Sequence, residues 1–234
     1  MPRILIVLTS HGELGDTGRS TGFHWEELAT PYWMFRDAGM EVELASIQGG
    51  TAPHDPTSLE AETDANPASV ARFLRDEGAM AALHSAMPLK EAVALRYDAV
   101  FLPGGHGTMF DLPGDRDLAE LIGTVFDAGH IVSAVCHGPA GLVAARRADG
   151  RPIVEGRRVN GFTDAEEAAA GLTDAMPFLL ETRLRELGGI FEGGADFKAY
   201  AVRDGNLVTG QNPASAGDVA RKVLDALGEA RSAA

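Results

Sequence analysis

The sequence predicts an α/β fold in which a mostly parallel sheet lies between layers of helices. Short apolar runs alternate along the chain with longer segments whose apolar residues recur at helical spacing. A parallel strand is buried on both faces, so it is a continuous apolar run, as in residues 3–8 and 130–135. The second run stops abruptly at Cys136, before His137-Gly138-Pro139. This break is typical of a buried strand that turns sharply into a helix.

The first half of the chain supplies four strands of this sheet. Residues 3–8 and 41–46 are predicted strands, and the helical spacing of TGFHWEELATPYWMFRDAGM between them predicts a helix. Residues 98–102 and 130–135 are two more buried strands, with an amphipathic helix between them from about 115 to 128. Repeated strand–helix units of this kind indicate a doubly wound parallel sheet.

The remaining segments complete one predicted domain over residues 1–230. Residues 47–97 are rich in turn residues and then in helical pieces, so we expect a loop and helix insertion over one end of the sheet. After Cys136 the predicted elements are a short strand at 157–160, one or two helices in 162–189, a hairpin and a closing helix. The hairpin turns at Asp204-Gly205.

Composition limits the classes of function. The chain has 234 residues and a formal net charge of −14, which disfavours nucleic acid and acidic membrane surfaces as partners. Its N-terminal residues lack the pattern of a secretory leader, and no segment approaches the roughly 20 apolar residues of a membrane span. We therefore expect a cytoplasmic location. A single cysteine cannot form an internal disulfide.

Cys136 is the strongest candidate for a reactive group. It follows a buried strand, and ligands of open parallel sheets gather at the carboxyl ends of the strands. A tight strand-to-helix turn directs backbone N–H groups and the helix dipole at the thiol, which lowers a thiol pKa and stabilises an oxyanion. The alternative is that Cys136 is only a small buried hydrophobe. The turn favours the reactive thiol.

The loop LPGGHGTMFDL follows another strand end and predicts an oxyanion donor. Consecutive glycines allow backbone N–H groups to turn toward a neighbouring site, so the N–H near Gly105 is the expected donor. The adjacent His106 either lines the substrate pocket or is an exposed loop residue. Without Cys136 nearby, an ordinary βα turn would explain this loop equally well.

The positions of the other titratable residues restrict the mechanism. No histidine follows His137, so a nucleophile followed by a distant histidine is excluded, and the base is His137 or an upstream group. Glu26 or Glu27 in the first turn of the first helix lies at the same sheet edge, unless it only compensates the helix dipole. No tight metal-ligand spacing is found, so no metal site is predicted.

Four segments together resemble a known superfamily: AVCHGPAGL, PGGHGTMFDL, EELATPYWMFRDAGMEVELAS and GNLVTGQNPASA. They are similar to the ThiJ/PfpI (class I glutamine amidotransferase-like) superfamily, and more closely to its heat-shock-protein-31-like, glyoxalase III-like branch. The resemblance covers nearly the whole chain. It implies a flavodoxin-like three-layer α/β/α sandwich with a nucleophile elbow, in a protein that is usually a homodimer.

The resemblance also implies roles for individual residues. The reactive cysteine of the superfamily falls on Cys136, and the histidine beside it falls on His137. The glutamate that hydrogen-bonds the thiol, four residues before Pro31, is Glu27. A further acid after the Gly-Phe-Thr turn completes a Cys-His-acid triad, for which Glu166 is the best match, although Thr163 to Glu166 also fits a helix capping box. Two alternatives stay open for this acid: Glu167 and Asp164.

The activity that the resemblance implies is that of a glutathione-independent glyoxalase, a lyase of the D-lactate dehydratase type. Methylglyoxal or glyoxal would add to Cys136 as a hemithioacetal, held by N–H groups near Gly105 and His137, and leave as lactate or glycolate. No glutathione, metal or organic cofactor is expected, and the partner is a small dicarbonyl substrate. The alternatives are a stress-associated holdase chaperone, a cysteine hydrolase, a deglycase and a redox sensor.

Overall fold

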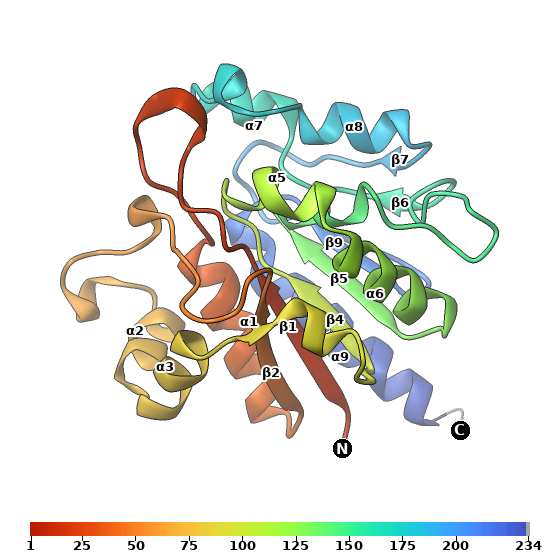
Figure 1. The fold of residues 1–234 in the computed structure, drawn as a ribbon, viewed down its shortest axis with the longest axis horizontal. Coiled ribbons are helices and arrows are strands. Elements are labelled where there is room, and N and C mark those ends of the chain that lie inside the picture. Colours follow the sequence, from red (N-terminus) through yellow and green to blue (C-terminus); the bar gives the residue numbers. More distant parts are fainter. Residues whose placement is uncertain (233–234) are drawn as a thin grey trace.

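The computed structural model describes residues 1–232 and contains a seven-stranded sheet with helices on both faces (Figure 1). Every neighbouring pair of strands in this sheet is parallel, except the last pair, which is antiparallel. The predicted mostly parallel α/β sandwich is therefore confirmed. In sheet order the strands are β3 (Met87–Pro88), β2 (Glu41–Ser46), β1 (Arg3–Leu8), β4 (Ala99–Leu102), β5 (Ile131–Val135), β9 (Leu207–Gly210) and β8 (Ala201–Asp204).

The alternation of side chains along the strands explains the two layers of core. In β1, Leu5 and Val7 belong to one hydrophobic cluster, whereas Ile4, Ile6 and Leu8 belong to the other. Helices α1 (Trp25–Asp37) and α9 (Ala216–Ser232) cover the second face. Helix α6 (Arg116–Asp127) covers the first face (Figure 1). Because both faces of β1 are packed, its sequence is continuously apolar.

Local signals in the sequence fix the ends of several elements. The carboxyl group of Asp115 accepts the Leu118 N–H at 2.8 Å and begins α6, close to the predicted start. Gly129, with a φ of 77°, follows the end of this helix. The β8–β9 hairpin pairs Asp204 with Leu207 and turns through Gly205 at a φ of 61°, as predicted.

The segment 47–97 forms more of the sheet than the sequence indicated. Its helices are α2 (Ala68–Arg75), α3 (Glu77–His84) and α4 (Leu89–Ala92), with 3₁₀ turns η2 (Pro56–Ser58) and η3 (Thr63–Ala65). Between α3 and α4, β3 pairs with β2 and becomes an edge strand. Two residues are too few to produce a strand pattern in the sequence.

The helix predicted after Cys136 is only a single 3₁₀ segment, η5 (Gly138–Leu142). Its backbone forms i→i+3 bonds, such as the Ala140 N–H to the His137 carbonyl at 2.9 Å. Such a short segment has little macrodipole, so individual N–H groups matter more than a helix dipole at Cys136.

The rest of this half contains short elements that carry site residues. The segment 162–189, where one or two helices were expected, contains two: α7 (Asp164–Ala169) and α8 (Leu180–Glu186). Strands β6 (Arg158–Val159) and β7 (Ile190–Phe191) pair in a separate small sheet. The remaining short elements are η1 (Gly15–Thr17), α5 (Thr108–Asp111), η4 (Leu112–Gly114), η6 (Thr173–Ala175) and η7 (Pro213–Ser215). Within residues 1–232, none of the helices has the length and apolar character needed to cross a membrane.

Candidate active site

Cys136 lies directly after β5 in a strained backbone conformation. Its φ is 59°, which a residue with a side chain rarely adopts, and its side chain is buried. The Cys136 N–H donates to Gly210 and its carbonyl accepts from Phe162, at 2.9 and 2.8 Å. Because hydrogen bonds on both sides hold this conformation, Cys136 has the geometry of a nucleophile elbow.

Glycines permit the close packing around this elbow. A Cβ on Gly104 would lie 2.6 Å from the His137 nitrogen, and one on Gly138 would lie 2.1 Å from the Leu102 carbonyl oxygen. Gly105 has a φ of 98° and would place a Cβ 2.2 Å from the Gly22 carbonyl oxygen. The loop after β4 therefore approaches Cys136 only because these positions have no side chain.

Glu27 reaches this loop from the first turn of α1. Its side chain is fully buried, and Oε2 accepts the Gly104 N–H at 2.6 Å. Burial raises the pKa of Glu27 to about 8, although the Gly104 N–H and the Cys136 thiol act in the opposite direction. Glu27 is therefore mostly protonated at neutral pH. Since Oε2 accepts a hydrogen bond from Gly104, the proton belongs on Oε1.

The pKa of the Cys136 thiol is raised, not lowered as the sequence predicted. Burial raises the pKa of Cys136 well above its usual range, and a charge on Glu27 adds to this, whereas the N–H groups of Gly105 and His137 oppose it. Below about pH 8 the Glu27 charge is largely absent, so desolvation is the main remaining cause. The buried thiol therefore needs a base to become a nucleophile.

His137 is placed to act as that base. Its Nδ1 lies 3.3 Å from the Cys136 sulfur, and its Nε2 lies 2.7 Å from Oε2 of Glu167. Burial lowers the pKa of His137 to about 4, with His106 adding to the shift, so the ring is neutral at pH 7. A carboxylate can only accept a hydrogen bond, so Nε2 carries the ring proton and Nδ1 presents a lone pair to the thiol.

Glu167, in α7, orients both histidines. Its Oε1 lies 3.0 Å from Nε2 of His106, while its Oε2 lies near His137. Burial alone would raise the pKa of Glu167, but the hydrogen bonds from the two histidines outweigh burial and lower this pKa to about 2. Glu167 is therefore an anion that fixes the tautomer of His137. The predicted pocket residue His106 lies here, with its ring 4.2 Å from that of His137.

Glu166, the first choice for the acid, forms no hydrogen bond with His137 in the described structure. Its Oε2 accepts the N–H and hydroxyl of Thr163, which forms the N-terminal cap of α7. Its Oε1 accepts hydrogen bonds from Phe197, Gln211 and Asn212.

The capping box explains this correction, since it turns the third residue of the helix back onto the cap. The next residue, Glu167, then points toward the histidines. The capping-box pattern was visible in the sequence and would have favoured Glu167. The third candidate, Asp164, accepts hydrogen bonds from Thr182 of α8 instead.

Sequence reasoning missed His24, which lies at the edge of this cluster. His24 precedes α1, and its N–H donates to the Gly104 carbonyl at 3.1 Å. Its Nδ1 lies 3.9 Å from Oε1 of Glu27. The only signal available in the sequence was its place three residues before Glu27, which a helix start brings onto the same side.

Among residues 1–232, one group of side chains could hold a metal ion. His106, His137 and Glu167 offer ligand atoms within 4.8 Å of one another. Each of these atoms already takes part in a hydrogen bond between a ring nitrogen and the carboxylate. Hydrogen bonding therefore accounts for their arrangement, and an ion would have to displace both ring protons.

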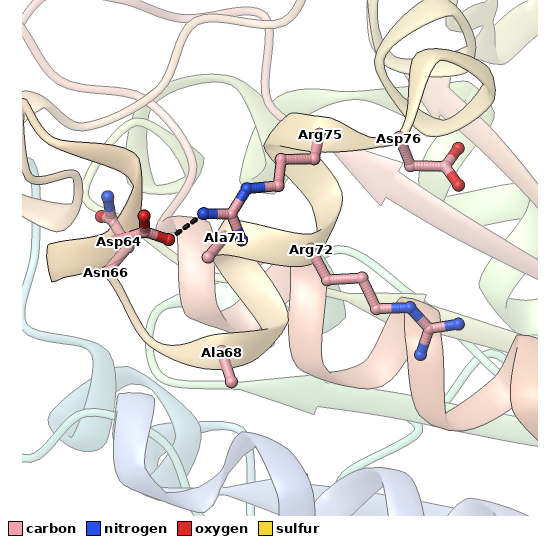
Figure 2. Close-up of a pocket in the computed structure, with 7 residues that line it drawn as sticks. All are labelled: Asp64, Asn66, Ala68, Ala71, Arg72, Arg75 and Asp76. Carbon is pink, nitrogen blue, oxygen red and sulfur yellow. Dashed lines mark hydrogen bonds and ion pairs between the residues drawn. The ribbon is translucent and has the colours of Figure 1, made fainter.

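A surface hollow of about 550 Å³ lies beside α2, but its charged groups are already paired (Figure 2). Arg75 points to Asp64 and forms an ion pair with it, while Arg72 extends away from them (Figure 2). Arg72 pairs with Asp37 at 2.7 Å and stacks over Trp33. None of the Cys136 cluster is among the lining residues, which are Asp64, Asn66, Ala68, Ala71, Arg72, Arg75 and Asp76.

The sequence is similar to those of known proteins over nearly its whole length. Glyoxalase 3 of Candida albicans is 33% identical over 236 residues, covering 97% of this chain and 98% of that protein. The Saccharomyces cerevisiae protein named glutathione-independent glyoxalase HSP31 is also 33% identical, covering 96% of this chain and 98% of its own.

Solved structures show the same similarity. Rapid Encystment Protein 24 kDa of Francisella tularensis has a TM-score of 0.91 and 32% identity, over 97% of this chain and 99% of that one. Glyoxalase III from Candida albicans has a TM-score of 0.86 and 33% identity, over 96% and 97%. The sequence also matches the model of the DJ-1/PfpI family over residues 20–226. With its elbow cysteine and full-length similarity, the chain belongs to the DJ-1/PfpI family.

Proposed function

We propose that this protein is a glutathione-independent glyoxalase that converts methylglyoxal or glyoxal into lactate or glycolate. One observation carries the proposal: the Cys136 thiol lies between a neutral base, His137, and the buried acid Glu27. Isomerising a dicarbonyl compound needs a nucleophile together with groups that both remove and supply protons. Relatives with glyoxalase names support the same activity.

The first step forms a bond between the Cys136 sulfur and the aldehyde carbon. His137 Nδ1 takes the thiol proton, the sulfur attacks C1, and the proton is delivered to the aldehyde oxygen to give a hemithioacetal. The N–H groups of Gly105 and His137 face the sulfur, so they are placed to stabilise the oxygen that becomes negative during attack.

The next steps move hydrogen from C1 to C2. The neutral base His137 removes the C1 proton, since Glu27 is protonated at neutral pH, and an enediol forms as the C2 oxygen gains a proton. Return of a proton to C2 and loss of the proton on the C1 oxygen leave a thioester of a 2-hydroxy acid. Water then cleaves this thioester and restores the thiol. Because C1 is oxidised while C2 is reduced, the chain of steps needs no external oxidant or reductant.

We also propose that the protein acts in the cytoplasm as a homodimer and uses neither nucleic acid nor a membrane as partner. The acidic net charge of −14 supports the last point. Light scattering on the purified protein measures the oligomeric state directly. A single-chain mass at micromolar concentration would remove the dimer from the proposal.

Surface composition favours the enzyme over the holdase alternative. Among the described residues, the exposed large hydrophobic side chains come from separate segments: Met1, Leu95, Ile190 and Phe197. A holdase needs an extended apolar surface to bind unfolded chains. The cysteine hydrolase and deglycase alternatives would use the same thiol, so they are separated by assay.

The experiment is lactate formation from methylglyoxal, without glutathione, by the purified wild-type protein and by Cys136→Ala. We expect turnover by the wild type and none above background by the variant, with little change in stability. Hydrolysis of p-nitrophenyl acetate is measured in parallel. Lactate formation that survives in Cys136→Ala would remove Cys136 as nucleophile, and ester hydrolysis without lactate would identify a hydrolase.

A further inference from the structure

Two unpartnered polar atoms face each other at the edge of the active site. Oε1 of Glu27 and Nδ1 of His24 are both buried, and neither has a hydrogen-bond partner among the described residues. The two atoms are 3.9 Å apart, and the Glu27 side chain is fully inaccessible. A buried polar group without a partner is costly, and such groups in native structures often indicate a missing ligand or water.

The distance between these atoms suits one shared oxygen. At 3.9 Å they are too far apart to bond directly. An oxygen about 2.8 Å from each atom would form a hydrogen bond with both and make an angle near 90° between them. Both atoms are therefore arranged for an external oxygen.

The backbone holds this gap in a fixed position relative to the thiol. The His24 N–H donates to the Gly104 carbonyl at 3.1 Å, and Oε2 of Glu27 accepts the Gly104 N–H at 2.6 Å. Gly104 is thus held from both sides, and the next residue, Gly105, directs its N–H toward the Cys136 sulfur. An oxygen bound in the gap is therefore positioned against the same loop as the attacked aldehyde.

We propose that His24 Nδ1 and Glu27 Oε1 form a subsite for the second oxygen of the substrate, the C2 carbonyl oxygen of a 2-oxoaldehyde. This inference rests on the proposed glyoxalase function. The N–H groups of Gly105 and His137 then bind the aldehyde oxygen on C1, and the subsite binds the carbonyl oxygen on C2. A simple aldehyde has no atom for this position, so the subsite selects vicinal dicarbonyl compounds.

The subsite takes part in the proton transfers. Glu27 donates its Oε1 proton to the C2 oxygen as His137 removes the C1 proton, which yields an enediol, a Glu27 carboxylate and a protonated His137. His137 then protonates C2, and Glu27 recovers a proton from the C1 oxygen as the thioester forms. Both groups end as they began. His24 stays neutral throughout and donates its Nδ1 proton as a second hydrogen bond to the C2 oxygen.

The surroundings of His24 favour this neutral state. Burial lowers the pKa of His24 to about 4, Asp55 opposes the shift, and His106 and His137 add to it. Its side chain keeps about a quarter of its surface exposed, which leaves Nε2 able to meet solvent. The neutral ring can therefore carry its proton on Nδ1, which faces the gap, while the unprotonated Nε2 accepts hydrogen bonds from solvent.

The test uses substitutions that separate the two ring nitrogens. The amide of asparagine occupies the region of Nδ1, the amide of glutamine reaches the region of Nε2, and phenylalanine keeps the ring shape without polar atoms. The variants are His24→Asn, His24→Gln and His24→Phe, with His84→Asn at an exposed position of α3 as the matched control. Each is assayed for kcat and KM with methylglyoxal.

We expect His24→Phe and His24→Gln to lower kcat on the order of 10²-fold, the usual effect of losing one donor to a developing charge. His24→Asn should recover most of this loss, and His84→Asn should match the wild type. A merely structural role would not favour asparagine over glutamine. Equal kcat in wild type and His24→Phe would overturn the subsite.

A binding measurement separates the subsite from the proposed activity. Methylglyoxal and propanal, each in excess over the protein, are compared for how well they protect Cys136 from alkylation by iodoacetamide. The initial rate of alkylation is measured. Preferential protection by methylglyoxal in the wild type, lost in His24→Phe and kept in His24→Asn, supports the subsite even if no lactate forms. Equal protection by the two aldehydes in the wild type would overturn the subsite even if lactate does form.

Discussion

At the residue scale, the chemistry depends on how burial and hydrogen bonds divide protons among four groups. Burial holds Glu27 neutral up to about pH 8 and His137 neutral down to about pH 4, while Glu167 stays ionised because two histidines donate to it. The Cys136 thiol is protonated at rest because burial raises its pKa. A weak acid and a weak base therefore flank the nucleophile across the whole neutral range.

The pH profile tests the role of Glu27. We expect kcat/KM of the wild type to fall above about pH 8, where Glu27 ionises, and below about pH 4, where His137 gains a proton. Glu27→Gln cannot supply a proton, so its kcat should fall by at least about 10²-fold, and the alkaline limb should disappear. The iodoacetamide profile of Cys136 should also move to lower pH, since the Glu27 charge that raises the thiol pKa is gone. An alkaline limb that persists in Glu27→Gln would assign that ionisation to another group.

Neighbouring glutamates in α7 offer a matched pair of substitutions. Glu167→Gln removes the anion that orients His137, so we expect kcat to fall by about 10²–10⁴-fold with little loss of stability. Glu166→Ala leaves the histidines untouched but strands buried donors of Gln211 and Asn212, so it should cost roughly 3 kcal/mol of unfolding free energy. Kinetics and urea denaturation measure the two effects. If Glu166→Ala lowered kcat more than Glu167→Gln did and left the unfolding free energy unchanged, a triad that contains Glu167 would be contradicted.

At the element scale, the site exists because three chain segments meet at the carboxyl ends of β4 and β5. The loop after β4 supplies Gly104 and Gly105, the turn after β5 supplies Cys136, and the first turn of α1 supplies Glu27. Sequence patterns predicted this meeting, because adjacent parallel strands end at one edge. They did not predict the length of the helix after Cys136, since a Gly-Pro start fits both a long helix and a short 3₁₀ turn.

These segments can pack closely only because Gly138 has no side chain, so a substitution at Gly138 tests the packing. A Cβ at this position would lie 2.1 Å from the Leu102 carbonyl oxygen, so the backbone of β4 or the elbow has to move. We expect Gly138→Ala to cost about 3 kcal/mol and to lower Tm by roughly 6–12 °C. Gly114→Ala is the control, because a Cβ there meets nothing within 4 Å. Equal Tm values for the two variants, measured by calorimetry, would show that the elbow tolerates a side chain.

At the scale of the whole molecule, the sequence predicted the layers and most strands but not every contact of the site. Buried strands such as 3–8 and 41–46 are recognisable because both faces of a parallel sheet exclude water. The strands β3 and β7 have two residues each, too short for any periodicity. The choice between Glu166 and Glu167 depended on side-chain direction within one turn of helix, which the capping-box pattern of Thr163 and Glu166 indicated but the resemblance did not. His24 was missed because its partner atom belongs to a residue one turn away.

The stability of the whole chain should depend on pH through Glu27. Its folded pKa of about 8 lies above the ordinary value of 4.5, so its contribution is complete below about pH 4.5 and is lost as the pH rises toward 8. Between about pH 5.5 and pH 7 we expect wild-type stability to fall by roughly 1.4 kcal/mol per pH unit from this group alone, and by less per unit as the pH approaches 8. Glu27→Gln should lack this slope in urea denaturation. Parallel slopes for both proteins would mean that Glu27 is already ionised in the folded state.

In the proposed mechanism, every turnover passes through a covalent bond between the substrate and Cys136. The most direct measurement is rapid acid quenching of the protein during reaction with methylglyoxal, followed by mass spectrometry of the peptide that contains Cys136, because a thioester survives acid. We expect one added methylglyoxal mass on Cys136, formed and lost at rates that match lactate production. Lactate production at full rate with Cys136 unmodified throughout would contradict it.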